Sequence, residues 1–162
     1  MLLLTPGPVM TRPEVRAALA QDIAPWDNEF KAVYARVLDR VRTIAGGVAG
    51  EHAALPLQGA GHFAIEAAMR TFVPAGRKVL IPATGRYSES MIRLTREAGR
   101  VPVVLPITPN EPTNPLAVEA ALQADPSISH VGQVYSETGS GIIHDAVAIG
   151  AAAVKRFTGQ RE

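Results

Sequence analysis

Hydrophobic residues recur at helical spacing in the first third of the chain. Between residues 29 and 44 they follow one another three or four positions apart, as Phe30, Val33, Tyr34, Val37, Leu38, Val41 and Ile44. This spacing predicts an amphipathic helix that ends before the pair Gly46-Gly47. A shorter helix is expected from Pro13 to Ala20 with Thr11 as its cap, and a turn at Pro25-Trp26-Asp27.

Short apolar runs alternate with helical segments in the rest of the chain. The apolar runs predict strands over residues 54–58, 78–82, 101–105 and 131–135. Helices are expected between and after them, over residues 61–72, 88–98, 116–124 and 145–157. This alternation predicts an α/β fold with a mainly parallel sheet and helices on both of its faces.

Length and charge narrow the class of protein. A chain of 162 residues with 47% hydrophobic content is large enough for one domain with a hydrophobic core. The net charge is +1, and the basic residues are scattered along the chain, so neither nucleic acid nor an anionic membrane is an expected partner. Four histidines without ligand spacing and no cysteine make a metal site improbable.

The expected location is the cytoplasm. Absence of cysteine excludes disulfides and favours a reducing compartment. No run approaches about twenty apolar residues, the length that spans a bilayer. The apolar start, Met1 to Leu4, is too short to be a signal sequence.

Chemistry is expected at the carboxyl ends of the predicted strands, where open parallel sheets bind ligands. Gly59-Ala60-Gly61-His62 follows the first predicted strand and begins a helix. Unpaired N–H groups and the helix dipole favour an anion there, and glycine lets the backbone approach a phosphate. A plain tight turn is the alternative interpretation. A dinucleotide site is disfavoured, because the second strand ends in Ile81-Pro82-Ala83-Thr84 without an acidic residue.

Two further segments follow strand ends. Tyr87 comes after Thr84-Gly85-Arg86 and is placed to lay its ring against a flat ligand, although packing is the more common role of a lone tyrosine. The stretch from Ser136 to Gly141 includes Thr138 and offers hydroxyls and a carboxylate for hydrogen bonds to a polar ring substituent. The alternative for that stretch is a capped turn before the last helix.

Together these segments resemble the class V, fold-type I pyridoxal-phosphate aminotransferases, and within them most of all the 2-aminoethylphosphonate–pyruvate transaminases. The resemblance covers nearly the whole chain. It rests on Leu2-Leu3-Leu4-Thr5-Pro6-Gly7-Pro8, Trp26-Asp27, the segment from Gln58 to Ala67, Gly85-Arg86-Tyr87, the segment from Asp125 to Val131, and Ser136-Glu137-Thr138.

The resemblance implies a fold, a cofactor and site residues. The fold is the N-terminal part of the large domain of these enzymes, and the cofactor is pyridoxal 5'-phosphate. Gly59, Ala60, Gly61 and His62 are expected to hold its phosphate, Tyr87 to stack on its ring, and Thr138 to hydrogen-bond near the ring oxygen. The segment from Thr5 to Pro8 is expected to line the mouth of the substrate site.

The implied reaction transfers an amino group from a phosphonate or small amino acid to pyruvate or a similar 2-oxo acid. By the resemblance, the residues that follow Glu162 in relatives carry an aspartate for the ring nitrogen, the lysine that binds the cofactor covalently, and an arginine for the substrate. We therefore expect residues 1–162 to be a truncated large domain without the small domain, inactive alone. The polar stretch from Thr158 to Glu162 is not expected to form a central strand.

None of the three lysines is expected to replace the missing one. Lys78 starts a strand and lies at the opposite end of the sheet, Lys155 is in the last turn of a helix, and Lys31 is on a solvated helix face. No catalytic residue is therefore assigned. This chain differs from the pattern of the relatives at four positions. The relatives tend to have a hydroxyl residue in place of His62, glycine in place of Ser88, arginine in place of Ser90 and threonine in place of Gly139.

The implied sheet order places the strand at 78–82 between those at 101–105 and 131–135. The strand at 54–58 then has no partner, and the strand at 131–135 has an unpaired edge. We expect self-association, as a homodimer or by docking of the strand at 54–58 onto that edge. An interaction module, or half of a split enzyme that a second chain completes, is the alternative function; a small binder of phosphate ligands is a third.

Overall fold

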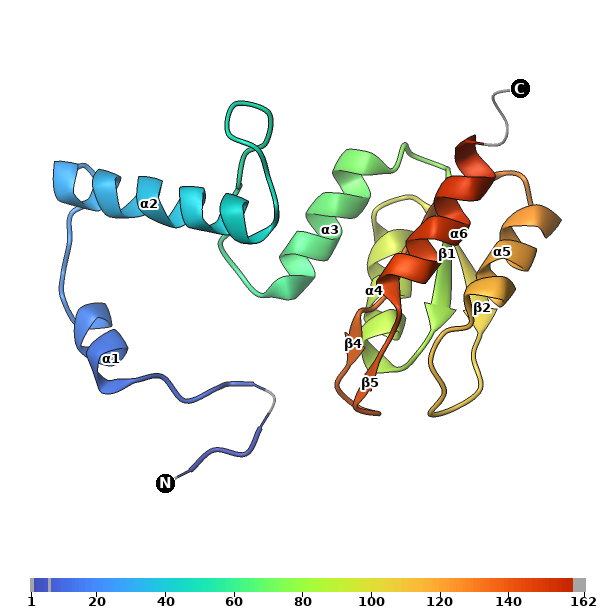
Figure 1. Ribbon diagram of the computed structural model, residues 1–162, viewed down its shortest axis with the longest axis horizontal. Coiled ribbons are helices and arrows are strands. Elements are labelled where there is room, and N and C mark those ends of the chain that lie inside the picture. The colour runs from blue at the N-terminus through green and yellow to red at the C-terminus, as the bar shows by residue number, and fades with distance from the viewer. Residues whose placement is uncertain (1, 6, 159–162) are drawn as a thin grey trace. The chain divides into compact units, whose positions relative to one another are not determined.

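The structure, a computed structural model, describes residues 2–5 and 7–158. Pro6 of the predicted substrate-mouth segment and the predicted polar tail 159–162 lie outside the described residues. The chain divides between Leu57 and Gln58 into two compact units. The first unit contains helices, and the second contains helices and strands (Figure 1).

The first unit holds two helices, α1 (Pro13–Leu19) and α2 (Asn28–Ile44). Helix α2 matches the amphipathic helix predicted from the hydrophobic spacing, and its rings Phe30 and Tyr34 stack with centroids 6.0 Å apart. The cap predicted for α1 is wrong: Arg12, not Thr11, occupies the N-cap position. None of the described residues of this unit is buried.

The predicted strand at residues 54–58 is absent from the structure, which has neither helix nor strand over that stretch. Leu55 is 82% exposed, so its side chain is not packed into a core. A strand needs a neighbouring strand to satisfy its N–H and C=O groups. No strand pairs with residues 54–58 among the described residues.

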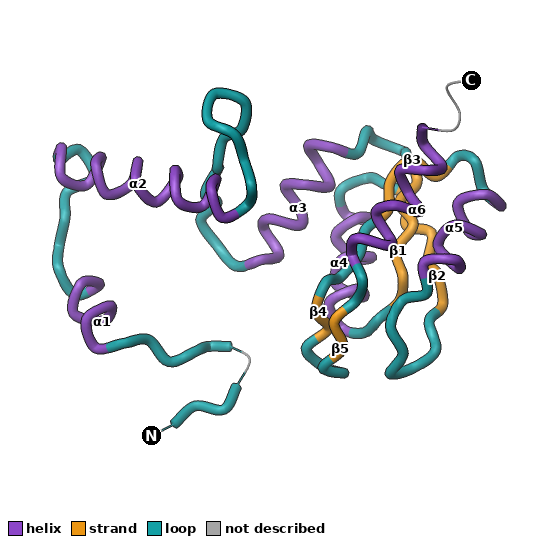
Figure 2. Tube along the Cα trace, in the orientation of Figure 1, coloured by secondary structure: helices purple, strands orange, loops and turns teal. Residues whose placement is uncertain are grey.

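The second unit is a three-stranded parallel sheet between two pairs of helices (Figures 1 and 2). Its strands are β1 (Lys78–Ala83), β2 (Val101–Pro106) and β3 (Ile128–Val131), in the order β2-β1-β3. Its helices are α3 (Gly61–Phe72), α4 (Arg86–Glu97), α5 (Pro115–Ala124) and α6 (Ala146–Thr158). The expected α/β architecture and sheet order are confirmed.

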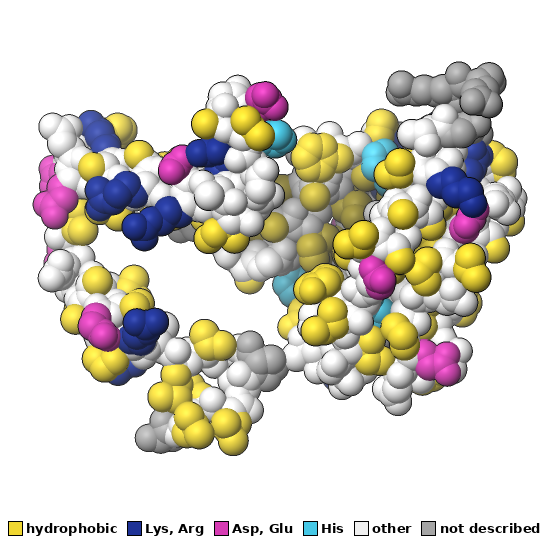
Figure 3. All heavy atoms as spheres, viewed as in Figure 1, with side chains coloured by type: hydrophobic (Ala, Val, Ile, Leu, Met, Phe, Trp, Pro, Cys, Tyr) yellow, Lys and Arg dark blue, Asp and Glu magenta, His cyan; other side chains and the backbone are white. Residues whose placement is uncertain are grey.

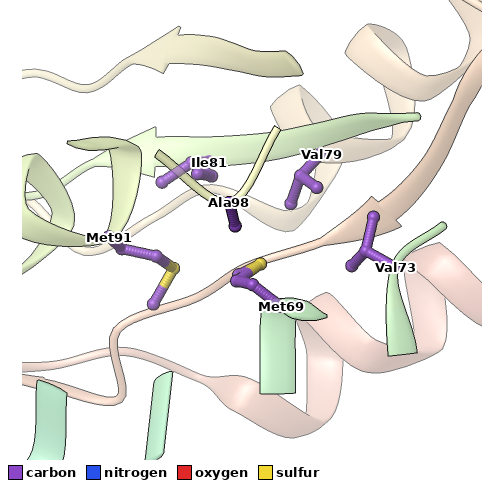
Figure 4. Close-up of a cluster of buried hydrophobic side chains, with 6 residues drawn as sticks. All are labelled: Met69, Val73, Val79, Ile81, Met91 and Ala98. Atoms are coloured by element: carbon purple, nitrogen blue, oxygen red, sulfur yellow. The ribbon is translucent and has the colours of Figure 1, made fainter. Parts of the chain in front are cut away.

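The central strand β1 is buried on both faces, as its continuous apolar sequence predicts. Val79 and Ile81 face a core shared with α3 and α4, which contains Met69, Val73, Met91 and Ala98 (Figure 4). Leu80 faces the other way and packs with Val118, Leu122, Ile128 and Ile149, mostly from α5 and α6. Alternation along one strand thus builds both cores of the unit.

An ion pair fixes the end of the sheet where β1 begins. The Nζ atom of Lys78 lies 2.7 Å from Oδ2 of Asp125, the residue after α5. This hydrogen bond and those from Ser127 lower the pKa of Asp125 to about 2. As predicted, Lys78 lies at the amino end of β1, away from the strand end that leads to Tyr87.

The fourth predicted strand is displaced in the structure. Strand β3 spans Ile128–Val131 in place of residues 131–135, and the last contact is the N–H of Gly132 donating to the carbonyl of Leu80 at 2.8 Å. Pairing ends there because the next position on β1 is Pro82, which has no N–H to donate. The chain then leaves the sheet and forms a hairpin of β4 (Ser136–Glu137) and β5 (Ile142–Ile143) (Figure 2).

Candidate functional site

Helix α3 begins at the glycine-containing turn that the sequence marked as an anion site. Ala60 is its N-cap and Gly61 its first residue, and no side chain caps the first turn. Gly59 has φ of +139°, and a Cβ there would lie 2.3 Å from the Phe63 ring, so the close approach of that ring requires glycine. Because alanine at the N-cap has no hydrogen-bonding side chain, the first-turn N–H groups of this 12-residue helix have no side-chain acceptor.

Helix α4 begins two residues earlier than predicted, at Arg86 in place of Ser88. The Ser88 hydroxyl accepts from the Gly85 N–H at 3.0 Å and donates to the Gly85 carbonyl at 2.6 Å. This closed turn satisfies a backbone donor at the helix start and fixes its first residue. Tyr87 therefore lies in the first turn of α4, at the carboxyl end of β1.

The stretch from Ser136 to Gly141, treated in the sequence as hydroxyl-rich loop or capped turn, is the first half of the β4–β5 hairpin. Thr138 follows β4 directly and is exposed. Its neighbour Glu137 is buried, with 1% of its surface exposed. The hairpin returns through the N–H of Gly141, which donates to the Glu137 carbonyl at 2.8 Å.

The structure brings three of the six predicted residues into one pocket. His62 from α3, Tyr87 from α4 and Thr138 from the hairpin line a pocket of about 360 Å³. The remaining lining residues, which the sequence did not single out as binding residues, are Arg86, Ser90, Glu137 and Gly139. Gly59, Ala60 and Gly61 are not in its lining, but they form the turn and helix start that precede His62.

Helical spacing explains why two lining residues that were not predicted, Ser90 and Arg86, lie beside Tyr87. Ser90 is three residues after Tyr87, so the two lie on neighbouring positions of one helix face. Arg86 precedes Tyr87 in the same first turn. Glu137 carries no such signal, because its burial depends on contact with a segment fifty residues away.

The lining is chemically suited to an anionic aromatic ligand. Arg86 carries a fixed positive charge, and His62 and Ser90 have groups that donate hydrogen bonds to phosphate oxygens. The Tyr87 ring offers an aromatic face, and the Thr138 hydroxyl can donate to or accept from a ring substituent. These residue types fit a phosphorylated pyridine such as the one the sequence implied.

None of the lysines of the chain lines this pocket. Lys78 is paired with Asp125, and Nζ of Lys155 lies 2.6 Å from Oε1 of Glu119 on α5. Lys31 belongs to α2 in the first unit and is exposed. Among the described residues there is also no group of three metal-binding side chains, and none of the described helices is long and apolar enough to span a membrane.

The fold is similar to that of aminotransferases of known structure. Pyridoxamine-pyruvate aminotransferase from Mesorhizobium loti is similar with a TM-score of 0.86 and 26% identity, over 96% of this chain and 39% of that one. Aspartate aminotransferase from Thermus thermophilus is similar with a TM-score of 0.85 and 27% identity, over 96% of this chain and 43% of that one. The similarity lies in the N-terminal part of their fold.

In sequence the chain is similar to 2-aminoethylphosphonate–pyruvate transaminases. The enzyme of that name from Cupriavidus pinatubonensis is 40% identical over 151 residues, which are 93% of this chain and 39% of the relative. The one from Pseudomonas aeruginosa strain PAO1 is 41% identical over 148 residues, 91% of this chain and 40% of the relative. The chain thus spans about two fifths of the length of these relatives. No protein-family model matches it.

Proposed function

We propose that this chain supplies the pyridoxal 5'-phosphate-binding part of an aminotransferase that acts on 2-aminoethylphosphonate or a related amino donor and on pyruvate or a similar 2-oxo acid. One observation carries the proposal. His62, Tyr87 and Thr138, from three separate segments, line a single pocket at the carboxyl end of the sheet. The similarity to 2-aminoethylphosphonate–pyruvate transaminases supports the choice of donor and acceptor.

In this proposal each lining residue has a defined task. His62 and the first turn of α3 hold the phosphate, with Arg86 adding positive charge. Tyr87 packs on the ring, and Thr138 forms a hydrogen bond to the ring oxygen. Bound pyridoxal phosphate supplies the electron sink for amino-group transfer. The protein's part is to orient the ring and neutralise the phosphate charge.

We further propose that the chain alone does not catalyse transamination. Covalent binding of the cofactor needs a lysine at the site, and the three lysines lie on other parts of the molecule. Lys78 and Lys155 are each held in an ion pair with a carboxylate outside the pocket. Residues 1–162 then act as one part of the large domain, in the cytoplasm.

Titration with pyridoxal 5'-phosphate tests both proposals on the same sample. We expect saturable binding seen by absorbance, competition by inorganic phosphate, and no stoichiometric lysine adduct after borohydride reduction and mass analysis. With 2-aminoethylphosphonate and pyruvate added, we expect no alanine. A single adduct at Lys31, Lys78 or Lys155 would overturn the inactivity proposal, and absence of binding would overturn the cofactor proposal.

The second candidate function is one chain of a split enzyme. Strand β3 pairs with β1 along one edge, and no described strand covers its other edge. A second chain that adds a strand there would satisfy the free backbone groups of β3. The coding sequence that follows distinguishes the cases. An open frame encoding a strand with an aspartate and then a lysine supports the split enzyme, whereas the same residues out of frame exclude it.

A further inference from the structure

Glu137 is buried at a place where its neighbours are not. Ser136 and Thr138 on either side are exposed, whereas Glu137 has 1% of its surface exposed. Its Oε1 atom is buried and has no hydrogen-bond partner among the described residues. A buried acceptor without a partner costs stability, so fold stability alone does not account for a carboxylate at this position.

The carboxyl group of Glu137 lies against the turn that begins α4. A Cβ built on Gly85 would be 2.7 Å from Cδ of Glu137 and 2.9 Å from its Oε2. The Thr84 hydroxyl donates to Oε2 at 3.4 Å. Glu137 therefore fills the space that a side chain at position 85 would need, and Gly85, with φ of +148°, is the residue that permits this approach.

The hairpin that carries Glu137 is anchored at its other end. The N–H of His144, just after β5, donates to the Tyr135 carbonyl at 2.8 Å. Nδ1 of His144 accepts a hydrogen bond from the Thr113 N–H at 3.0 Å, which ties the hairpin to the segment before α5. Glu137 thus connects a fixed hairpin to the turn that the Ser88 hydroxyl closes from the helix side.

We propose that Glu137 is a positioning residue of the pocket. Through its contact with Thr84 and Gly85 it fixes the first turn of α4, and so sets Arg86 and Tyr87 opposite Thr138, which the same hairpin carries. The position of the aromatic face relative to the hydroxyl then depends on the contact of one side chain, Glu137, with the turn before Tyr87. Only the identity of the ligand rests on the proposed function.

Hydrogen exchange tests the positioning role of Glu137 without any ligand. In Glu137→Ala we expect amide exchange in residues 84–90 to rise by about tenfold or more, a local opening, with much smaller change in β1 and α5. Glu137→Gln keeps the size and one acceptor oxygen, so exchange in residues 84–90 should return to within about twofold of the unmodified chain. Glu51→Ala, in the first unit, is the matched control for loss of one carboxylate.

A double substitution tests the contact itself. Gly85→Ala introduces both the clash with Glu137 and backbone strain at φ of +148°. If the clash is real, Gly85→Ala should accelerate exchange less in the Glu137→Ala background than in the unmodified chain. Additive effects of the two substitutions would overturn direct contact.

Ligand selectivity distinguishes positioning from general stabilisation. Pyridoxal 5'-phosphate uses the ring contact, whereas inorganic phosphate does not. In Glu137→Ala we expect the Kd for pyridoxal 5'-phosphate to rise about fivefold or more while that for inorganic phosphate changes by less than about twofold. We also expect the induced circular dichroism of the bound ring to fall, with recovery in Glu137→Gln.

The outcomes separate this inference from the proposed function. The inference would be overturned if Glu137→Ala weakened the binding of both ligands equally. It would also be overturned if amide exchange became faster throughout the second unit with no excess at residues 84–90, because Glu137 would then be a structural residue only. If the unmodified chain does not bind pyridoxal 5'-phosphate, the proposed function fails, and the exchange result still decides the role of Glu137.

Discussion

The chemistry of this pocket comes from single side chains that lie near the ends of strands. Tyr87 contributes an aromatic face, His62 and Arg86 contribute donors, and Thr138 contributes a hydroxyl. They come from three separate segments, Arg86 and Tyr87 sharing the first turn of α4, and each is at least partly accessible to a ligand. The chemistry of these side chains therefore acts on whatever enters the pocket, while the backbone turns beneath them set their spacing.

Removing the Tyr87 ring should weaken binding of ring-containing ligands. In Tyr87→Ala we expect the Kd for pyridoxal 5'-phosphate to rise about tenfold, the effect of losing roughly 1–2 kcal/mol of ring contact. Tyr87→Phe keeps the ring and should bind within about twofold of the unmodified chain. Titration followed by absorbance measures both. Tyr34→Ala in α2 is the control, and equal loss of inorganic phosphate binding would contradict the assignment.

His144 should make stability depend on pH near neutrality. Burial lowers the pKa of His144, opposed by the nearby Glu137 carboxylate. The neutral ring is the one whose Nδ1 accepts from Thr113. The folded state therefore disfavours the proton: stability is full above the unfolded pKa of 6.5 and is lost as the pH falls through the lowered pKa of the folded state.

Urea unfolding at pH 8, 6.5 and 5 measures this dependence. In His144→Asn the amide oxygen can still accept from the Thr113 N–H, but nothing at that position titrates in this range. We expect the loss of stability between pH 8 and pH 5 to be smaller in His144→Asn. An identical pH profile in both proteins would exclude His144 as its source.

The residues of the pocket were predictable to different degrees. The rule that ligands bind at the carboxyl ends of parallel strands selected the segments that contain His62, Tyr87 and Thr138. Within those segments, the resemblance to aminotransferases selected His62 and Thr138. Glu137 was predicted only as part of a flexible stretch, because six polar or small residues in a row give no sign of burial. Its burial arises from the approach of Gly85, a tertiary contact that local sequence does not encode.

At the scale of elements, the sequence predicts helices better than strand limits. The helices α2 and α3 begin and end within one residue of prediction, because apolar spacing and glycine or proline fix their limits. The strand expected at 54–58 was wrong, and β3 was displaced by three residues at its start. Both errors concern pairing, which depends on the neighbouring strand.

The central strand should tolerate little change. Leu80 of β1 is 1% exposed and packs against residues of α5, β3 and α6. In Leu80→Ala we expect the free energy of unfolding to fall by about 2–5 kcal/mol, from lost apolar contact and the cavity left behind. Leu116→Ala on α5 removes the same atoms from a side chain that is 72% exposed. It should change the free energy of unfolding by less than about 0.5 kcal/mol. Urea denaturation monitored by circular dichroism compares them, and similar costs would contradict the assigned core.

At the scale of the whole molecule, the two units differ in how much they bury. All the buried side chains among the described residues belong to the second unit. In the first unit apolar side chains remain at the surface (Figure 3). On α2, Val37, Val41 and Ile44 are each about half exposed or more. A helix without a packed apolar face is of low local stability.

Limited proteolysis should therefore cut the first unit first. We expect early cleavage between residues 9 and 57 and a resistant fragment that begins near Gln58, because cleavage requires local unfolding. Mass analysis of a time course identifies the fragment. Early cleavage within β1 or α5, at the same rate as within α2, would contradict the difference in stability.

The unpaired edge of β3 and the exposed apolar face of α2 predict self-association. We expect an average mass above that of a monomer in size-exclusion chromatography with light scattering, rising with concentration, because both features are satisfied by a second copy. Addition of a charge at an exposed apolar position of α2, as in Val41→Lys, should lower the average mass if that helix contributes. A monomer over a hundredfold range of concentration would contradict this prediction.

The order of strands in the sheet bears on how the nascent polypeptide matures at the ribosome. Strand β1 is made first, yet one of its neighbours, β3, is about fifty positions later in the chain. Until β3 has been synthesised, the apolar face of β1 around Leu80 remains accessible to solvent or to chaperones. We therefore expect slower synthesis between Pro106 and Ile128 to prolong the time for which this apolar face is uncovered.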